Sequence, residues 1–508
     1  MDWLLDKKDQ EKMQLLRVVY REHDQYMTIQ RLMTQLQWSR YLIIDVVGRL
    51  AEDLSAEYGM TKSGDPILQV SADKKGILLT YSRQINTDAF MLKYLAQSLT
   101  WQFVVGLFNE TITSYAQFAE DNLTTVGSTR NIKATVETEL AAHHIRVDEQ
   151  YRLIGDDEMA VRLFFMRLAV RYFSKLDILF TPKVITYATD VATPFLSNVL
   201  GTTNFRDTKR LSTLFHFAIQ GTRVEHGHYS DALDANRVLQ PTDELEGQTQ
   251  LLLETGVSVL QSLTHAPLEV AEMEVRETLL YLYTSDLIGQ TDWRHNVTED
   301  ISSKINVFSK NLNRVYRRFF GYDVTPQVLQ AIEDRMVTPI VTYTLFPYDS
   351  GVRQKFELTD AQRLYPIAYD ITSEIIVALA EMLKSDLAAV RRFFFSHIFT
   401  NLVSFARNES LYDPIIIQID INYRPGLEDM LKYMISGMVE FNVSFTTQYS
   451  EEVDIVISDS YKHVVDRESV FDWSMLPNAK QVEQLRNRLS QLKLTKFRKK
   501  FPTLQESE

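Results

Sequence analysis

The chain has 508 residues, is 45% hydrophobic and 24% charged, and carries a formal net charge of −13 at pH 7. This length predicts several domains, and the few glycines and prolines favour a mainly helical chain over a sheet-rich one. The lack of cysteine excludes disulfides, cysteine-ligated metal sites and thiol nucleophiles. The acidic balance argues against a protein that coats nucleic acid, yet it permits site-specific DNA binding through a local basic face.

Neither the start of the chain nor its apolar runs predict export or membrane insertion. The first ten residues, MDWLLDKKDQ, lack the basic region and the apolar core of a secretory signal. The runs LFFMRLAV and RRFFFSHIF are interrupted by charge and fall short of a membrane span. We therefore expect a cytoplasmic protein without a membrane segment, and the sequence indicates no cofactor.

The first part of the chain, residues 1–83, has the pattern of a winged helix-turn-helix. Residues 9–21 predict an amphipathic helix, and residues 26–54 predict two helices separated by a short polar turn. Two strand-like runs, residues 67–70 and 77–79, predict a small hairpin, the wing. An ordinary helical hairpin is the alternative, and it leaves the wing unexplained. The residues expected to contact DNA, at the polar N-terminal end of the second helix, are Ser39, Arg40 and Tyr41.

The same plan recurs in residues 84–158. A helical stretch and a turn lead to a longer predicted helix, residues 128–144, whose apolar positions are four apart. The alternating residues 145–154 predict a second wing. Arg, Asn, Ser and Thr pair with base edges and Lys positions phosphates, although Ser and Thr also serve as plain helix caps. The residues expected to contact DNA in this unit are Ser128, Thr129, Arg130, Asn131 and Lys133.

Residues 151–168, YRLIGDDEMAVRLFFMRL, resemble the junction between the second helix-turn-helix and the regulatory part of Mga- and AtxA-like regulators of Gram-positive bacteria. The resemblance lies in Leu153, Gly155, Glu158 and Arg162. It implies two DNA-binding units, two phosphotransferase-system regulation domains and a C-terminal domain similar to enzyme IIB. The implied domain ranges are 1–83, 84–158, 159–289, 290–405 and 410–508.

The first regulation domain would contain His216 and Arg223, which stand seven residues apart and so share one face of a helix. By itself the pattern indicates a surface histidine. The resemblance implies instead that His216 accepts phosphate from carrier proteins of the sugar phosphotransferase system and that Arg223 contacts that phosphate. His226 and His228 follow in a loop without a third ligand at helical spacing, so we expect no metal site.

The second regulation domain departs from the family pattern. No histidine occurs between His295 and His397. The resemblance then implies that this domain cannot be switched by histidine phosphorylation. Its expected work is packing and the formation of a homodimer.

The C-terminal residues alternate between strand-like and helical patterns. Residues 414–421, 441–446 and 453–458 predict strands, and residues 426–438 predict the helix between the first two. This order predicts a small parallel α/β sheet, similar to enzyme IIB. The loop at residues 422–426 has no phosphate-carrying cysteine, which excludes phosphotransfer by that route and leaves sensing or self-association. Residues 479–501 predict an amphipathic helix with a basic, solvated end.

Taken together, these patterns predict a multidomain, mainly α protein with N-terminal winged helix-turn-helix units and a small C-terminal α/β domain, and the resemblance implies that the part between them forms two helical-bundle regulation domains. The predicted function is a dimeric transcription regulator that binds double-stranded DNA, and the resemblance implies control by phosphocarrier proteins. An RNA-binding antiterminator shares the regulation domains but begins with a small all-β domain. An enzyme would need a nucleophile or a convergent polar cluster, and a scaffold would leave both wings unexplained.

Overall fold

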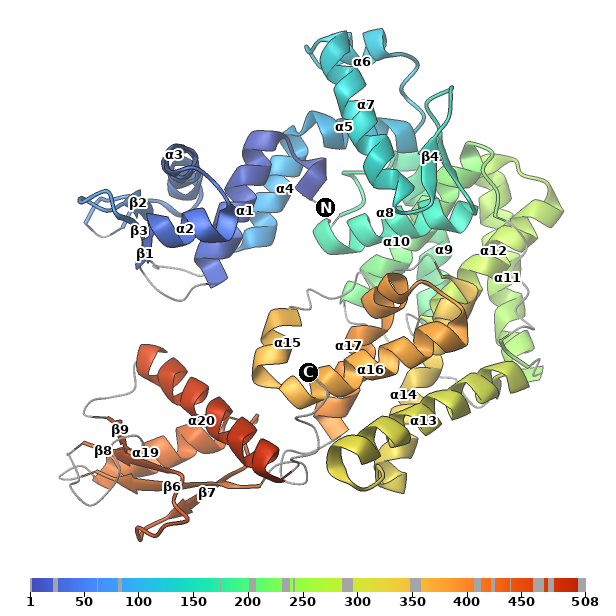
Figure 1. Cartoon of the computed structure of the whole chain (residues 1–508). Coiled ribbons are helices and arrows are strands. Elements are labelled where there is room, and N and C mark those ends of the chain that lie inside the picture. The colour runs from blue at the N-terminus through green and yellow to red at the C-terminus, as the bar shows by residue number, and fades with distance from the viewer. Residues whose placement is uncertain are drawn as a thin grey trace. The chain divides into compact units, whose positions relative to one another are not determined.

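The computed structural model of the chain forms two compact units, in which helices dominate as the composition predicts (Figure 1). Unit 1 comprises Met1–Asp234 and Thr242–Thr291, and unit 2 comprises Ala235–Pro241 and Asp292–Glu508. The residues that the structure describes are 2–21, 26–61, 63–80, 85–173, 175–200, 207–230, 238–240, 243–285, 296–347, 358–405, 413–421, 425–438, 440–459, 470–473 and 479–500.

Unit 1 begins with a winged helix-turn-helix. Its elements are η1 (Asp2–Leu4), α1 (Lys7–Arg21), β1 (Tyr26–Thr28), α2 (Ile29–Leu36), α3 (Arg40–Tyr58), β2 (Leu68–Val70) and β3 (Gly76–Leu79). The strands form an antiparallel sheet in the order β1-β3-β2. The predicted helices and both wing strands are confirmed. Strand β1 was not predicted, because residues 26–28 were included in the predicted helix pair.

Local caps fix the turn between α2 and α3. Thr28 accepts a hydrogen bond from the backbone N–H of Arg31 and starts α2. Gln37 ends α2 in the left-handed region, with φ of 56°. Ser39 then caps α3 by accepting from the backbone N–H of Leu42, as predicted. The apolar stripe of α3, which includes Ile43, is buried against the neighbouring elements.

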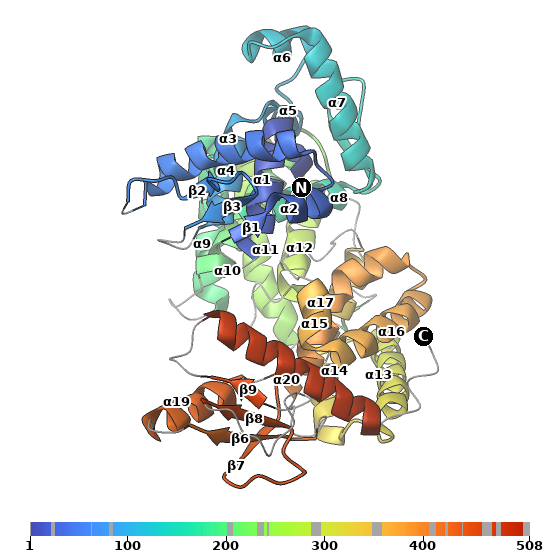
Figure 2. The same cartoon turned by 60° about the vertical axis from the view of Figure 1, so that its left-hand side comes forward.

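A second winged helix-turn-helix follows. Its elements are α4 (Thr87–Gln97), α5 (Leu99–Phe108), α6 (Tyr115–Asp121), α7 (Val126–Ala141), β4 (Ile145–Val147) and β5 (Leu153–Gly155). Strands β4 and β5 pair antiparallel and form the predicted second wing. Helix α7 begins two residues earlier than predicted, because Thr125 is the N-cap and accepts from the backbone N–H of Ser128. Helices α6 and α7 protrude from the other helices of unit 1 in both views (Figures 1 and 2).

The rest of unit 1 is a helical bundle. Its elements are α8 (Glu158–Tyr172), α9 (Pro182–Leu200), α10 (Asp207–Glu225), α11 (Asp243–Thr264) and α12 (Leu268–Thr284). Helix α8 is buried along almost its whole length and packs against α10 and β5. It therefore joins the second wing to the bundle.

Unit 2 contains a second helical bundle and a small α/β domain. The bundle elements are α13 (Glu299–Phe320), α14 (Pro326–Leu345), α15 (Leu358–Leu364), α16 (Pro366–Leu383) and α17 (Leu387–Phe405). The α/β elements are β6 (Ile415–Asp420), α19 (Pro425–Ser436), β7 (Val443–Thr446), β8 (Ile455–Ser458), β9 (Val470–Asp472) and α20 (Ala479–Lys500). The sheet is parallel throughout, in the order β7-β6-β8-β9, which confirms the predicted parallel α/β sheet.

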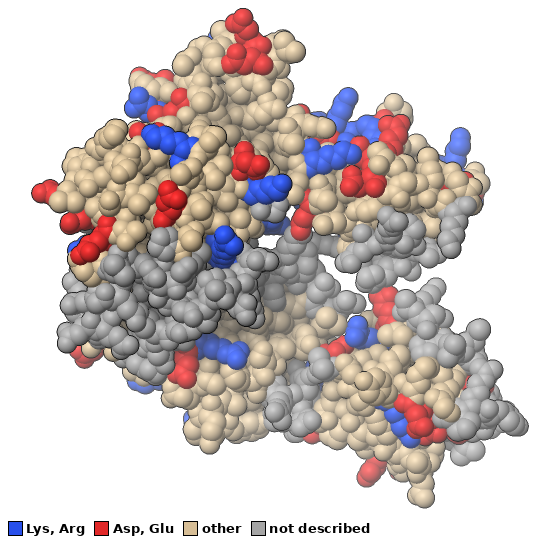
Figure 3. Space-filling model, turned by 180° about the vertical axis from the view of Figure 1, so that it is seen from behind, with Lys and Arg blue, Asp and Glu red and all other residues tan. Residues whose placement is uncertain are grey.

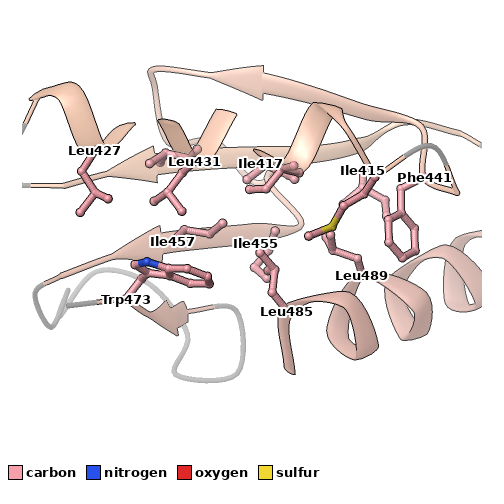
Figure 4. Packing of buried hydrophobic residues seen from close by; sticks show 13 residues of the cluster. Ile415, Ile417, Leu427, Leu431, Phe441, Ile455, Ile457, Trp473, Leu485 and Leu489 are labelled. Atoms are coloured by element: carbon pink, nitrogen blue, oxygen red, sulfur yellow. The ribbon is translucent and has the colours of Figure 1, made fainter. Parts of the chain in front are cut away.

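The core of the α/β domain forms where side chains of α19 and α20 meet those of the strands (Figure 4). Leu485 and Leu489 of α20 and Trp473 after β9 are fully buried. Strand β9 was not predicted. Of the loop predicted to lack a phosphate carrier, residues 422–424 lie outside the described residues.

The basic end of α20 is packed only in part: Lys493 and Lys496 have partners within the domain, whereas Arg498 and Lys499 are exposed as predicted. The ammonium of Lys493 donates a 2.9 Å hydrogen bond to the carbonyl of Glu440, and burial lowers the pKa of Lys493 to about 8. Lys496 forms a 2.5 Å ion pair with Asp454. The aliphatic stems of these lysines can cover apolar surface while their charges find partners, a use that a count of basic residues does not reveal.

Candidate nucleic-acid interface

The exposed face of α7 is polar or methyl-bearing and contains a single cation. Its exposed residues recur at helical spacing: Val126, Gly127, Arg130, Asn131, Ala134, Thr135 and Thr138. The guanidinium of Arg130 lies 5.7 Å from the ring centroid of Tyr115, an aromatic contact that restricts its position. Arg and Asn are the side chains that pair bidentately with guanine and adenine in the major groove.

Three of the predicted contact residues of α7 occupy other positions than expected. Thr129 is 0% exposed and its hydroxyl donates to the carbonyl of Thr125, so its predicted exposure is wrong. The reason is periodicity, since Thr129 stands seven residues before the buried Val136 and on the same stripe. Ser128 is half-buried. Lys133 forms a 2.6 Å ion pair with Glu137, and only 18% of its side chain is exposed.

In the first winged helix-turn-helix, the predicted residues lie at the N-terminus of α3. Ser39 is exposed but serves as the cap, and the Tyr41 side chain is 82% exposed. The guanidinium of Arg40 donates a 2.7 Å hydrogen bond to the carbonyl of Lys74 in the wing turn. This bond ties the start of α3 to the wing and brings Arg40 next to two exposed lysines, Lys74 and Lys75.

The two wing turns differ in charge. The first turn carries Lys74 and Lys75 beside one carboxylate, Asp73, whereas the second carries Asp148 and Glu149 beside one cation, Arg152. Asp148 accepts hydrogen bonds from the backbone N–H groups of Gln150 and Arg152 and so shapes its own turn. Phosphates attract the first turn and repel the second. On the face of the molecule seen in Figure 3, cations and carboxylates are otherwise interspersed.

A buried ion pair joins the second wing to the bundle. Arg223 of α10 is 0% exposed and donates from Nε and Nη2 to both carboxylate oxygens of Glu158, at 2.7 and 2.8 Å. Its Nη2 also donates to the carbonyl of Leu153 in β5, at 2.8 Å. Burial alone would raise the pKa of Glu158, but the hydrogen bonds from Arg223 outweigh it and hold that pKa below its ordinary value.

A second arginine extends this network into α12. Arg162 of α8 donates to Glu274 at 2.6 and 3.2 Å and to Glu158 at 3.2 Å, and all three side chains are buried. Glu277 lies 3.7 Å from Arg162 and, within the described part of the chain, its carboxylate accepts no hydrogen bond. Burial raises the pKa of Glu277 to about 8. Glu158 and Arg162 are the charged residues of the sequence pattern at 151–168, which gives that pattern a structural role.

The network also reaches the loop before α6. The imidazole Nε2 of His228 contacts the carboxylate of Glu110, and the carbonyl of His228 accepts from Arg162 at 3.1 Å. Sequence analysis missed Glu110, Glu274 and Glu277. For Glu274 the sequence does contain a signal, which is a charged residue on the face of a helix that is otherwise buried. Glu274 lies between Ala271 and Thr278 on that face of α12, and both are buried.

The predicted phosphate acceptor and its arginine are both interior residues. His216 is 3% exposed, and its ring stacks on Tyr281 with the centroids 4.6 Å apart. The guanidinium of Arg223, predicted to contact the phosphate, is bound to Glu158 in this structure. The two residues do share a face of α10, but that face is turned inward. In the described residues, no cluster of three His, Asp or Glu could hold a metal ion, and no helix is long and apolar enough to cross a membrane.

These features define a protein with two consecutive winged helix-turn-helix units, the fold class that places a helix in the DNA major groove. Residues 83–169 match the family model described as the Mga helix-turn-helix domain. The match spans the second winged helix-turn-helix and most of α8. It supports the resemblance to Mga-like regulators and indicates a DNA-binding transcription regulator. The comparison with curated proteins finds no match. The family match gives the antiterminator alternative no support.

Proposed function

We propose that this protein is a cytoplasmic transcription regulator of the Mga type that acts by binding promoter DNA rather than by catalysis. The observation that carries the proposal is the protruding helix α7, whose exposed Arg130 and Asn131 lie within the matched region. These side chains are suited to guanine and adenine edges. Thr129 is not part of this surface, and Lys133 contributes to it only weakly because Glu137 neutralises it.

The first winged helix-turn-helix would position the protein on the DNA backbone. Its wing presents Lys74 and Lys75, and Arg40 is held beside them. Tyr41, which is mostly exposed, adds a hydroxyl that can donate to a phosphate. Phosphate contacts fix the position of a protein along the DNA without recognising its sequence. The first winged helix-turn-helix would therefore position the protein, and the second would recognise bases.

Replacing Arg130 tests base recognition. A duplex selected from random DNA with the wild-type protein is titrated by fluorescence anisotropy. Arg130→Ala should weaken binding to it by about 1–3 kcal/mol and relax base preference at one position. Arg314→Ala, which removes an exposed helical arginine of unit 2, is the matched control and should leave affinity unchanged. Equal affinity and footprint for Arg130→Ala and wild type would exclude this role.

Control by the sugar phosphotransferase system remains part of the proposal, resting on the family resemblance. Because His216 is buried against Tyr281, phosphorylation would require α10 and α12 to separate locally. Labelled phosphoenolpyruvate and the general phosphocarrier proteins provide the assay. Label in the wild type and none in His216→Ala would support the site. Equal label in both places the acceptor elsewhere, and no label in either excludes this control.

We further propose that the protein is a homodimer and that its α/β domain contributes to self-association. The support is a parallel sheet in the order β7-β6-β8-β9 together with exposed side chains of α19, Met430 and Tyr433. Truncation before Asp413 should lower the mass measured by light scattering while the N-terminal units stay folded. An unchanged mass would move the dimer contact to the helical bundles.

A further inference from the structure

Gly127 is a helical glycine that the fold of this protein does not need. It is the second residue of α7, it is exposed, and its φ is not positive. A Cβ built on it would meet only the Thr125 hydroxyl oxygen, at 3.9 Å, which is ordinary contact. Glycine is a poor helix former compared with alanine. If helix stability alone determined the residue at this position, alanine would be expected there.

Other helical glycines of unit 1 have a packing reason. A Cβ at Gly106 would lie 2.8 Å from Ile112, and one at Gly221 would lie 2.7 Å from Tyr187, so both are held at glycine by their neighbours. Gly48 of α3 resembles Gly127 in having nothing within 4 Å. However, Gly48 lies between exposed Asp45 and Glu52 on its helix face, and these carboxylates repel a nucleic acid.

The surroundings of Gly127 point to a specific occupant. The exposed residues around it are Val126, Arg130, Asn131 and Ala134, none of which is acidic. Valine and alanine methyl groups suit the 5-methyl group of thymine, and Asn131 suits adenine, the base that pairs with thymine. Because Gly127 has no side chain, the surface at the start of this helix is open and has room for a methyl group.

We propose that Gly127 is the point where α7 comes closest to the base edges, and that a thymine 5-methyl group fills the gap left by its missing side chain. This inference rests on the proposed function, since it specifies what the DNA-binding helix recognises. Gly127 then determines specificity at an A·T pair through shape, while Asn131 and Arg130 supply hydrogen bonds.

Adding the missing methyl group is the first test. In the full-length protein, Gly127→Ala should unfold at the same temperature as wild type or higher, because alanine favours the helix. It should nevertheless bind the selected duplex roughly tenfold more weakly, because the new methyl group overpacks the contact. Gly48→Ala is the matched control, with the same gain for its helix and unchanged affinity. Wild-type affinity of Gly127→Ala would overturn the proposal.

Removing the methyl group from the DNA is the complementary test. Each thymine of the selected duplex is replaced in turn by uracil, which lacks the 5-methyl group. At one position wild type should lose roughly fourfold in affinity, as expected for one buried methyl group. At that same position Gly127→Ala should bind uracil as well as thymine or better. If the alanine variant is equally weak with both bases, the thymine contact is wrong. If wild type selects no DNA sequence, the proposed function itself fails.

Discussion

Replacing Arg223 by methionine should destabilise unit 1 through Glu158 rather than through lost volume. Methionine keeps the length and apolar character of the arginine stem inside the bundle. It removes two charge-assisted hydrogen bonds to Glu158 and one bond to the carbonyl of Leu153. Glu158 is then left buried, with the 3.2 Å contact to Arg162 as its remaining ion pair.

The expected loss follows from the burial of both partners. Removing one member of a buried ion pair costs about 3–5 kcal/mol, because the other charge stays desolvated without its partner. Arg162 still compensates part of that charge, so the lower end, about 3 kcal/mol, is expected. The double variant Arg223→Met/Glu158→Gln should recover much of the loss, with a coupling of about 1–3 kcal/mol. Lys183→Met breaks the exposed pair with Glu225 and should cost less than about 1 kcal/mol.

Urea unfolding gives the free-energy change, and hydrogen exchange over α8 and α10 shows where the loss occurs. The effect should also depend on pH in one direction. Because the folded-state pKa of Glu158 lies below its ordinary value of 4.5, its contribution is complete above that value and is lost as pH falls through the folded-state pKa. The gap between variant and wild type should therefore shrink in acid. A loss below about 1 kcal/mol, or additive single and double variants, would refute this reasoning.

Three further predictions concern other parts of the chain. In the folded state the pKa of Glu277 is raised to about 8, whereas the unfolded chain releases this proton above about pH 4.5. The free energy of unfolding of wild type should therefore fall as pH rises from 4.5 toward 8. The variant Glu277→Gln has no such proton, so its thermal unfolding should not show this loss between about pH 5 and pH 8. Replacing Lys74 and Lys75 by alanine should reduce the slope of log affinity against log salt by up to about 2, with base preference unchanged, as salt titrations of DNA binding would reveal. Leu485→Ala should cost unit 2 about 2–5 kcal/mol in urea unfolding, because Leu485 is fully buried; a smaller loss would mean that α20 is dispensable for the sheet.

The sequence predicted the elements of the fold well where the pattern was long or the punctuation strong. The helix pairs, the Ser39 cap and both wings follow from apolar spacing and turn residues. Strand β1 was missed because its residues were included in the predicted helix pair of residues 26–54. Strand β9 was missed although it is as long as β2, β4 and β5, which were predicted. The packing of Lys493 and Lys496 of α20 was not predicted, because their partners, Glu440 and Asp454, lie far away in the sequence.

The site was predicted less well, because its residues were chosen by chemical type and by their place near the start of the helix. Arg130 and Asn131 are exposed, but Thr129 lies on the same stripe as Val136 and is buried with it. His216 was expected at the surface because its spacing to Arg223 shows that they share a face, but not which way the face turns. Its buried position is decided by tertiary packing against Tyr281, which periodicity alone does not contain.

The ion pair between Arg223 and Glu158 has a practical consequence for anyone who divides this chain into pieces. The predicted boundary between residues 158 and 159 runs through the network, because both acceptors of Arg223, Glu158 and Leu153, precede it. A fragment that starts at residue 159 would bury the guanidinium of Arg223 without these two acceptors. A fragment that ends at residue 158 would contain Glu158 without Arg223. The second winged helix-turn-helix is therefore not a portable module, and exchanging it between proteins would require the matching residues of α10 to move with it.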